Sequence, residues 1–298
     1  MKTLINSKKD LAAAAELTDL LGVLKSIASM EYRSLEKKQK RFTNFLTELE
    51  TFFQMIDFSS VSHPLVRAQN GILGIIIISS DEGFMGGLNV QVVEKALSIP
   101  GAHQAKLIVV GRYGAGYLRG LGMTFTEFPG ITSEQRYEDA LRLKDFVMKE
   151  TWREPFSRLV MVYPKPVSFT QQIPEVLSIL PCHEGFSRSF SPQEAAGRAI
   201  MESPEDGIIE YLVETWMTHV FFVTFEGSKL SEFAARTIHL EQSYQHLQEQ
   251  KKQLHYQYLR MRHEQVDRNM REVFSSQMFQ AGLRTAIHTT QGGMIERR

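Results

Sequence analysis

The hydrophobic and polar positions divide the chain into three zones that differ in periodicity. Between residues 8 and 56 there is no proline, and apolar residues recur at alternating steps of three and four. This stepping predicts a long helix with an apolar seam against a partner helix. The seam positions are Leu17, Leu20, Leu24, Ile27, Phe42, Phe45, Leu49, Phe52 and Ile56. The nearly all-polar stretch 31–41 between the two groups indicates that the helix lies partly in solvent.

The middle zone, residues 71–181, consists of short apolar runs bounded by glycine and proline. Runs that are rich in β-branched residues and too short for a typical helix predict buried strands. The predicted strands are 72–78, 107–110, 159–163 and 168–179, and the predicted helices are 90–97 and 134–150. Ser133 is the expected N-cap of the second helix. Strands that alternate with helices indicate an α/β layered domain with a largely parallel sheet.

The third zone follows a mostly polar connection at residues 183–206. Residues 208–284 contain no proline and only two glycines, Gly227 and Gly282. The apolar seam of this zone is Leu240, Tyr244, Leu247, Leu254, Tyr258 and Met261, continued by Val266, Met270 and Val273. A seam of this length exceeds what an ordinary globular helix needs.

Together the zones predict an α/β fold: a Rossmann-like parallel-sheet domain inserted between long N- and C-terminal helices that form an antiparallel coiled coil. The expected boundaries are 1–60 for the N-terminal coiled-coil helix, 68–205 for the α/β domain and 206–298 for the C-terminal coiled-coil helix.

Composition restricts the possible functions. Lys and Arg together number 34, as do Asp and Glu, so no global field draws the chain to nucleic acid or to an anionic membrane. The single Cys182 excludes an intramolecular disulfide and a cysteine-cluster metal site, and we expect a buried, inert thiol in a reducing compartment. The amino terminus lacks a signal-peptide pattern, and no stretch has the roughly 20 apolar residues of a membrane span. Any membrane association is therefore expected to come through partners.

The glycine-rich run 79–89 is the most conspicuous candidate for chemistry, because it lies between a predicted strand and helix, where helix N-terminal amides can bind a phosphate. It lacks both G-x-x-x-x-G-K-[ST] and G-x-G-x-x-G, so a tight structural turn is the favoured interpretation over nucleotide binding. The second glycine-rich run, 111–116, is interpreted in the same way.

The C-terminal helix offers two weaker signals. His239, His246, His255 and His263 lack the i,i+4 spacing that presents two metal ligands on one face, so solvated positions are favoured. A basic, glutamine-rich face runs from Gln242 to Arg271, and the residues alone leave open whether it is solvated or contacts a partner.

Several stretches resemble the gamma subunit of F-type ATP synthases, and the likeness covers nearly the whole chain. The run from Ser79 to Asn89 is similar to the family's Ser-Thr-Asp-x-Gly-Leu-x-Gly-Gly-Leu-Asn turn, and the run from Ser231 to Arg236 matches its Ser-Glu-x-Ala-Ala-Arg signature. Weaker echoes are Leu24, Ile27, Ala28 and Arg33 near the amino end, Gln172 to Pro174 with Leu180-Pro181, and Tyr258, Arg262, Val266, Met270, Glu272 and Val273 near the carboxyl end.

The sequence departs from the family pattern at polar positions of the shaft. Glu31 replaces a lysine, His263, Asp267 and Asn269 stand where the family has Gln, Thr and Glu, and the Thr-x-Asn stretch is lost near 244–246. This pattern suits a divergent lineage such as the alternative, sodium-type bacterial enzymes.

The resemblance implies a non-catalytic rotor without a cofactor, which couples ion flow to ATP synthesis or hydrolysis at the cytoplasmic face of the bacterial plasma membrane. The implied partners are three alpha and three beta subunits, the epsilon subunit and the membrane c-ring, with no nucleic acid. The implied partner-contact residues are Leu24, Arg33, Glu82, Phe84, Met85, Gly86, Gly87, Asn89, Arg236, Arg262, His263, Asp267, Asn269 and Glu272. The alternatives are a coiled-coil adaptor and a nucleotide-binding α/β enzyme.

Overall fold

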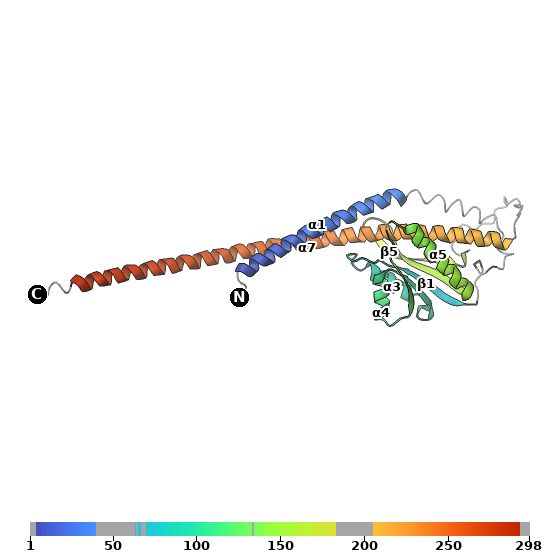
Figure 1. Ribbon diagram of the computed structural model, residues 1–298, viewed down its shortest axis with the longest axis horizontal. Coiled ribbons are helices and arrows are strands. Elements are labelled where there is room, and N and C mark those ends of the chain that lie inside the picture. Colours follow the sequence, from blue (N-terminus) through green and yellow to red (C-terminus); the bar gives the residue numbers. More distant parts are fainter. Residues whose placement is uncertain are drawn as a thin grey trace. The chain divides into compact units, whose positions relative to one another are not determined.

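The computed structural model describes residues 4–39, 63, 65–66, 70–132, 134–182 and 205–292 (Figure 1). The chain forms two compact units, one of Met1–Val23 with Gln242–Arg298 and the other of Leu24–Glu241. Two helices run through both units: α1 spans Leu4–Gln39, and α7 spans Glu205–Gly292 without interruption. The predicted long helices are therefore present, whereas the seam positions from Phe42 to Ile56 lie outside the described residues.

The larger unit contains a five-stranded sheet with the order β3-β2-β1-β4-β5. Its elements are β1 Ile72–Ile78, α3 Leu88–Leu97, the 3-10 turn η1 Ala102–Gln104, β2 Lys106–Val110, α4 Arg112–Gly120, β3 Phe125–Phe128, α5 Arg136–Arg153, β4 Phe156–Pro166 and β5 Gln172–Leu180. The first four strands pair in parallel, and β5 runs antiparallel to β4 at the edge. The predicted, largely parallel α/β sheet is confirmed.

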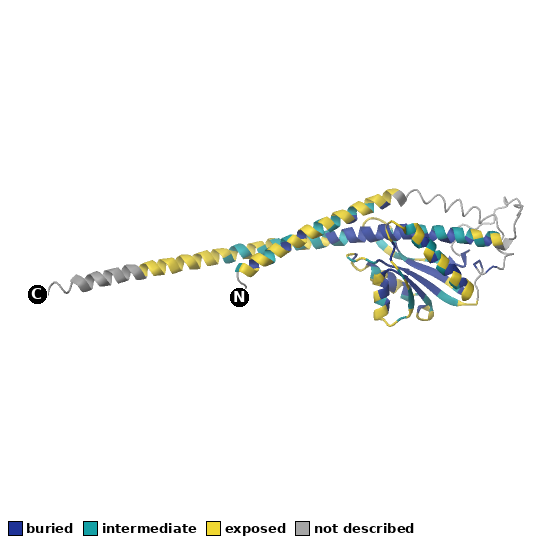
Figure 2. Ribbon diagram, viewed as in Figure 1, coloured by how far each residue is buried: buried dark blue, intermediate teal, exposed yellow. Residues whose placement is uncertain are grey.

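Alternate residues of β1 supply the two hydrophobic layers that cover the sheet. Ile75 and Ile77 pack with α3 and α4 on one face. Ile76 and Ile78 pack with α5 and α7 on the other. Alternation follows from the strand, in which successive side chains point to opposite faces. Figure 2 shows most of β1, β2 and β4 as buried, together with the stretch of α7 that faces them.

The part of α7 that covers the sheet carries an apolar stripe. The buried members are Ile209, Val213, Trp216, Met217, Val220, Phe221 and Phe225. Their spacing of three to four residues places them on one side of the helix. This stretch of α7 is consequently part of the core of the α/β domain.

Three local features differ from the sequence-based expectation. Strand β3 was not predicted, because its four residues, Phe-Thr-Glu-Phe, lack a β-branched apolar run. The last strand begins at Gln172 and not at residue 168, since residues 167–171 form the turn between β4 and β5. Helix α5 begins at Arg136 after Gln135, which makes no side-chain cap, and Ser133 lies outside the described residues.

The seam predicted for the N-terminal helix is wrong in register. Leu17, Leu20 and Ile27 are exposed, and Leu24 is only half-buried. The positions that face inward are Ser7, Leu11, Ala14, Thr18, Leu21, Lys25, Ala28, Tyr32 and Leu35, which also step by three and four. Thr18 satisfies its hydroxyl locally by donating to the Ala14 carbonyl at 2.6 Å. Four of these nine side chains, at Ser7, Ala14, Thr18 and Ala28, are small.

The pairing of α1 with α7 is antiparallel, as predicted. In the larger unit Leu35 packs with Leu230 and Phe233, and Lys25 lies 2.9 Å from a Glu241 oxygen. In the smaller unit Gly22 lies against the Tyr244 ring. Residue numbers thus rise along α7 as they fall along α1.

The seam of α7 is confirmed as far as Met261 and no further. Leu240 is buried, and Tyr244, Leu247, Leu254, Tyr258 and Met261 are half-buried. All residues from 262 to 278 are exposed, including Val266, Met270 and Val273, which were predicted to continue the seam. These three side chains have no helix to pack against in the described part of the chain.

Replacing Phe221 by alanine should lower the free energy of unfolding by about 3–5 kcal/mol, because the ring is fully buried between α7 and the sheet. Tyr211 on the same helix is 70% exposed, and its replacement by alanine is the matched control. Chemical denaturation followed by circular dichroism measures both. Equal effects of the two substitutions would contradict the assigned core.

Tyr163 on β4 should make stability depend on alkaline pH. Burial raises the pKa of Tyr163 to about 12, and the negative charge of Glu175 adds to the effect. Between pH 10 and 12 the unfolded chain loses this proton while the folded chain keeps it, so stability falls as pH rises. Comparison of unfolding midpoints across this range should show a shallower decrease for Tyr163→Phe.

Candidate functional site

The turn between β1 and α3, residues 79–87, adopts a backbone that few sequences allow. Phe84 has a φ of 65°, and Gly86 has a φ of 59°. Positive φ suits glycine but is uncommon for a bulky residue. Asn89 fixes the start of the turn, since its side-chain oxygen accepts from the Ser80 amide and its nitrogen donates to the Ser80 hydroxyl. The predicted tight structural turn is therefore what this run forms.

Asp81 connects this turn to the next two loops of the sheet. Its carboxylate accepts from the Arg112 amide at 2.8 Å and from the Gly130 amide at 3.1 Å. A Cβ on Gly130 would lie 2.4 Å from the Asp81 carboxyl carbon, so only glycine allows this approach. One carboxylate thus holds three loops at the carboxyl ends of the strands.

The first amides of α4 are all taken by the protein itself. Besides the Arg112 amide, Tyr113 donates to the Ser80 carbonyl and Gly114 donates to the Ser79 hydroxyl. A phosphate at a helix N-terminus needs free amides. The glycine-rich run 111–116 therefore has no anion site at its helix end.

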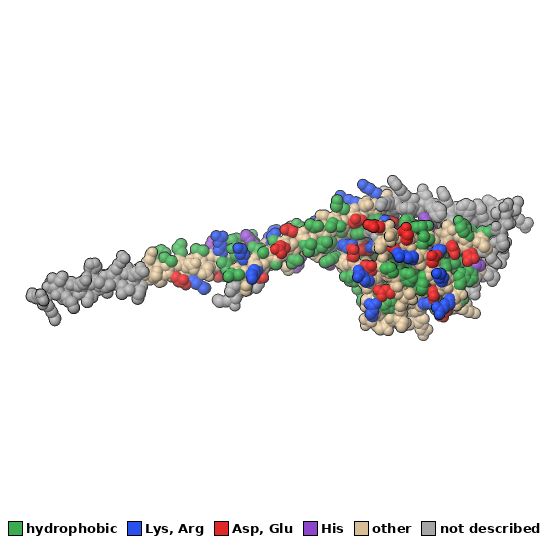
Figure 3. Space-filling view, viewed as in Figure 1, with side chains coloured by type: hydrophobic (Ala, Val, Ile, Leu, Met, Phe, Trp, Pro, Cys, Tyr) green, Lys and Arg blue, Asp and Glu red, His purple; other side chains and the backbone are tan. Residues whose placement is uncertain are grey.

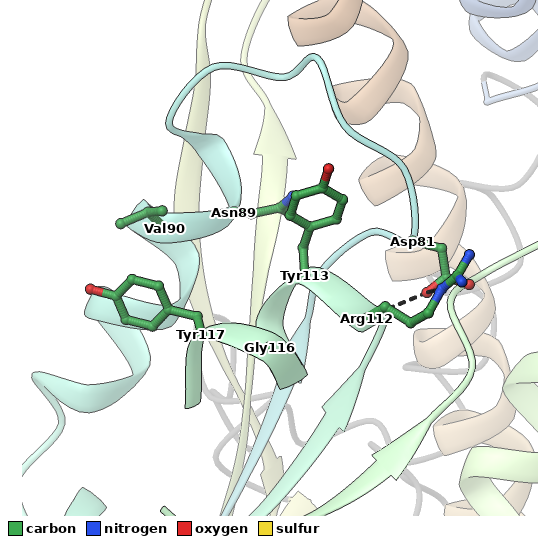
Figure 4. A pocket seen from close by; sticks show the side chains of 7 residues that line it. All are labelled: Asp81, Asn89, Val90, Arg112, Tyr113, Gly116 and Tyr117. Carbon is green, nitrogen blue, oxygen red and sulfur yellow. Dashed lines mark hydrogen bonds and ion pairs between the residues drawn. The ribbon is translucent and has the colours of Figure 1, made fainter. Parts of the chain in front are cut away.

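A shallow pocket of about 520 Å³ lies between α3 and α4 beside this turn (Figure 4). Its lining residues are Asp81, Asn89, Val90, Arg112, Tyr113, Gly116 and Tyr117. Asp81 and Asn89 are engaged in the loop contacts above, and the Arg112 guanidinium lies 3.8 Å from the Asp81 carboxylate, so most of the remaining lining is aromatic and apolar. Such a surface offers packing area and no set of convergent donors for a phosphate or a sugar.

Arg236 on α7 connects the turn to the long helix. Its Nη1 lies 2.9 Å from a Glu82 carboxylate oxygen, and its Nε donates to the Gly83 carbonyl at 3.2 Å. Its Nη2 donates to Glu232, one helical turn earlier, at 2.6 Å. The other Glu232 oxygen accepts from Lys229 at 2.8 Å. We call these four side chains, Glu82, Lys229, Glu232 and Arg236, the ion network.

An apolar contact supports the ion network. Met85 is buried against Leu88 and Ala235. The turn is therefore attached to two adjacent residues of α7. Arg236 makes the polar contact, and Ala235 makes the apolar contact. A second buried ion pair, Arg136 with Glu226, connects α7 to α5 elsewhere in the domain.

The structure brings half of the predicted site residues together. Glu82, Phe84, Met85, Gly86, Gly87, Asn89 and Arg236 all belong to this turn or its attachment to α7. Glu82 and Phe84 are exposed at 70% and 55%, whereas Met85 and Arg236 are buried. The bonds of Arg236 and Asn89 are thus made within the chain, and the exposed members are those free to meet a partner.

The remaining predicted residues lie on the long helices. Arg33 is exposed and Leu24 is half-buried on α1. On α7, Arg262, His263, Asp267, Asn269 and Glu272 are all exposed. Asn269 accepts from Gln265 at 2.9 Å, which is a local contact along one helix.

Sequence reasoning missed Asp81, Lys229 and Glu232 as parts of this site. The signal for Glu232 was present, because a Glu and an Arg four residues apart face each other on a helix. Nothing local identifies Asp81 as the common acceptor, since its two donors lie 31 and 49 residues away.

Charges of both signs are mixed on the visible face of the α/β domain, as Figure 3 shows. Within the described residues no three His, Cys, Asp or Glu side chains cluster as metal ligands do. Among the described helices, none is both long and apolar enough to cross a membrane.

Fold and site together define a protein built around two long antiparallel helices, in which one helix is attached through an ion network to a Rossmann-like domain. The chain belongs to the ATP synthase family, whose model matches residues 4–278.

Curated relatives match over most of the chain. The ATP synthase gamma chain of Alkaliphilus metalliredigens is 22% identical over 91% of this chain and 93% of its own length. The gamma chain of Rubrobacter xylanophilus is 21% identical over 92% of this chain and 97% of its own. In solved structures, a chain of the Euglena gracilis mitochondrial ATP synthase, from the structure of its OSCP, F1 and c-ring, shares the fold. Its TM-score is 0.70 and its identity 16%, covering 97% of this chain and 95% of that one.

Replacing Asp81 by alanine should lower the free energy of unfolding by about 2 kcal/mol, because the Arg112 and Gly130 amides lose a charged acceptor. Asp145→Ala is the control, since Asp145 is exposed and, among the described residues, pairs with its neighbour Lys144. A surface pair of that kind contributes about 0–1 kcal/mol. Denaturant titration of both variants distinguishes the two cases.

Proposed function

We propose that this chain is the gamma subunit, the central rotor shaft, of a bacterial F-type ATP synthase. It transmits rotation between the membrane c-ring and the hexamer of three alpha and three beta subunits. The observation that supports this most directly is that α7 is one uninterrupted helix of 88 residues. Its first part belongs to the core of the α/β domain, and its later part forms the seam with α1. A helix that contributes to both units is the kind of element that a rotor shaft requires.

The exposed apolar side chains of the shaft support a partner that surrounds it. Leu17, Leu20, Val23, Ile27 and Met30 are exposed on α1. Val266, Met270, Val273, Phe274 and Met278 are exposed on α7. Exposed apolar residues in rows of this length are typical of interaction surfaces. We assign them to contacts with the alpha and beta subunits.

The predicted polar contacts fit the same arrangement. Arg262, His263, Asp267 and Glu272 are exposed on the stretch of α7 that has no seam partner among the described residues. Exposed charges form contacts that water can replace, which suits a surface that must bind and release at each step. Glu82 and Phe84 are the members of the turn available for such contact.

The chain has no catalytic role in this proposal. The α4 amides are occupied by Asp81, Ser80 and Ser79, which argues against nucleotide chemistry at that helix. Catalysis then belongs to other subunits, and we place this chain at the cytoplasmic face of the plasma membrane through contacts with epsilon and the c-ring. An adaptor that only tethers partners has less support, because it does not need a domain attached to the helix by a buried ion network.

The first test is co-expression with the alpha and beta subunits of the same genome. We expect one copy of this chain per three alpha-beta pairs, and sustained magnesium-ATP hydrolysis only when the chain is present. Native mass spectrometry gives the stoichiometry, and a coupled assay gives the turnover. A chain that stays outside the complex, with hydrolysis independent of it, would refute the rotor and favour the adaptor.

A further inference from the structure

The turn that carries Phe84 is held in an unfavourable backbone state. A phenylalanine at φ 65° costs conformational energy and persists only when its surroundings impose it. Its ring is nevertheless 55% exposed, so packing of the ring does not compensate for the strain. The restraint must come from the neighbouring residues.

Those restraints converge on two adjacent residues of α7. Arg236 binds the residues before Phe84, through the Glu82 carboxylate and the Gly83 carbonyl. Ala235 packs against Met85, the residue after Phe84. Phe84 is therefore fixed on both sides by one turn of the long helix.

Arg236 is itself oriented before it meets the turn. All three of its guanidinium nitrogens have partners, and its side chain is 9% exposed. Glu232 holds the inner edge of the guanidinium, and Lys229 holds the second Glu232 oxygen. Charge-assisted bonds of this kind are directional, whereas apolar packing is not. The ion network can thus fix the angle of the turn about the helix axis. The apolar stripe of α7 alone would not fix this angle, because apolar packing allows the two surfaces to shift.

We propose that Glu232 and Arg236 are positioning residues that lock the Glu82–Met85 turn to α7, so that the exposed Phe84 turns with the shaft. The inference rests on the proposed rotor function. In this proposal the Ser-Glu-x-Ala-Ala-Arg signature has a mechanical role inside the chain. Arg236 makes the turn rotate together with the helix and does not itself contact a partner.

The test for the lock itself uses the full-length chain and hydrogen exchange. Arg236→Lys keeps the charge, but the lysine ammonium cannot reproduce the planar guanidinium contacts with Glu82, Gly83 and Glu232. We expect the Ser80 and Leu88 amides, which donate to the Asn89 side chain and to the Met85 carbonyl, to exchange about tenfold faster or more, because the turn opens locally. Arg136→Lys is the matched control, since the Arg136–Glu226 pair between α5 and α7 is as deeply buried but does not reach the turn. Glu82→Gln is the second variant, because Glu82 is exposed and its loss leaves the fold intact.

The mechanical role is measured in the assembled complex in membrane vesicles, as ion transport per ATP hydrolysed. We expect this ratio to fall for Arg236→Lys, to fall less for Glu82→Gln and to stay at the wild-type value for Arg136→Lys. Unchanged exchange of the Ser80 and Leu88 amides, an unchanged ratio, or an equal loss in Arg136→Lys would each overturn the proposal. Failure of the wild-type chain to support coupled transport would instead count against the rotor function.

Discussion

The apolar contact between α7 and the sheet is the interaction on which the other features of the larger unit depend. The stripe from Ile209 to Phe225 covers the face of the sheet that presents Ile76 and Ile78. Without that cover, this face would expose a large apolar surface to water. The α/β domain therefore needs the first part of the C-terminal helix to complete its own core.

Along α7 the chemistry of the inward-facing side chains changes twice. Large apolar residues meet the sheet up to Phe225, and charged residues from Glu226 to Arg236 are buried in ion pairs. From Leu240 the helix returns to a heptad-like apolar seam. Each stretch faces a different neighbour, and so a single average periodicity does not describe the helix.

The sequence predicts the architecture better than it predicts the details of contact. The strand at 72–78 and the helix near 134–150 are recognisable because their apolar patterns are strong and local. The seam of α1 was placed on the wrong face, since both faces step by three and four and the large residues Leu17 and Leu20 gave the stronger signal. Small residues such as Ala14 and Ala28 line the actual seam, and no hydrophobicity pattern distinguishes them from ordinary helix formers.

At the candidate site, too, the sequence predicts the local motifs but not the contact between them. The turn 79–89 was recognised as special from its glycines, and its likeness to the family motif was specific. The bond from Arg236 to Gly83 spans 153 residues, and such a contact can be read only from the folded chain. The two best family motifs were therefore recognised separately, whereas the structure shows that they are two halves of one contact.

The end of the seam at Met261 has a mechanical consequence. Up to that residue α7 is braced by α1, but from 262 to 278 every side chain is exposed and the helix stands alone within the described chain. A single helix resists torsion less than two packed helices do. Under load the elastic deformation of this smaller unit would concentrate in the stretch of α7 from residue 262 to 278.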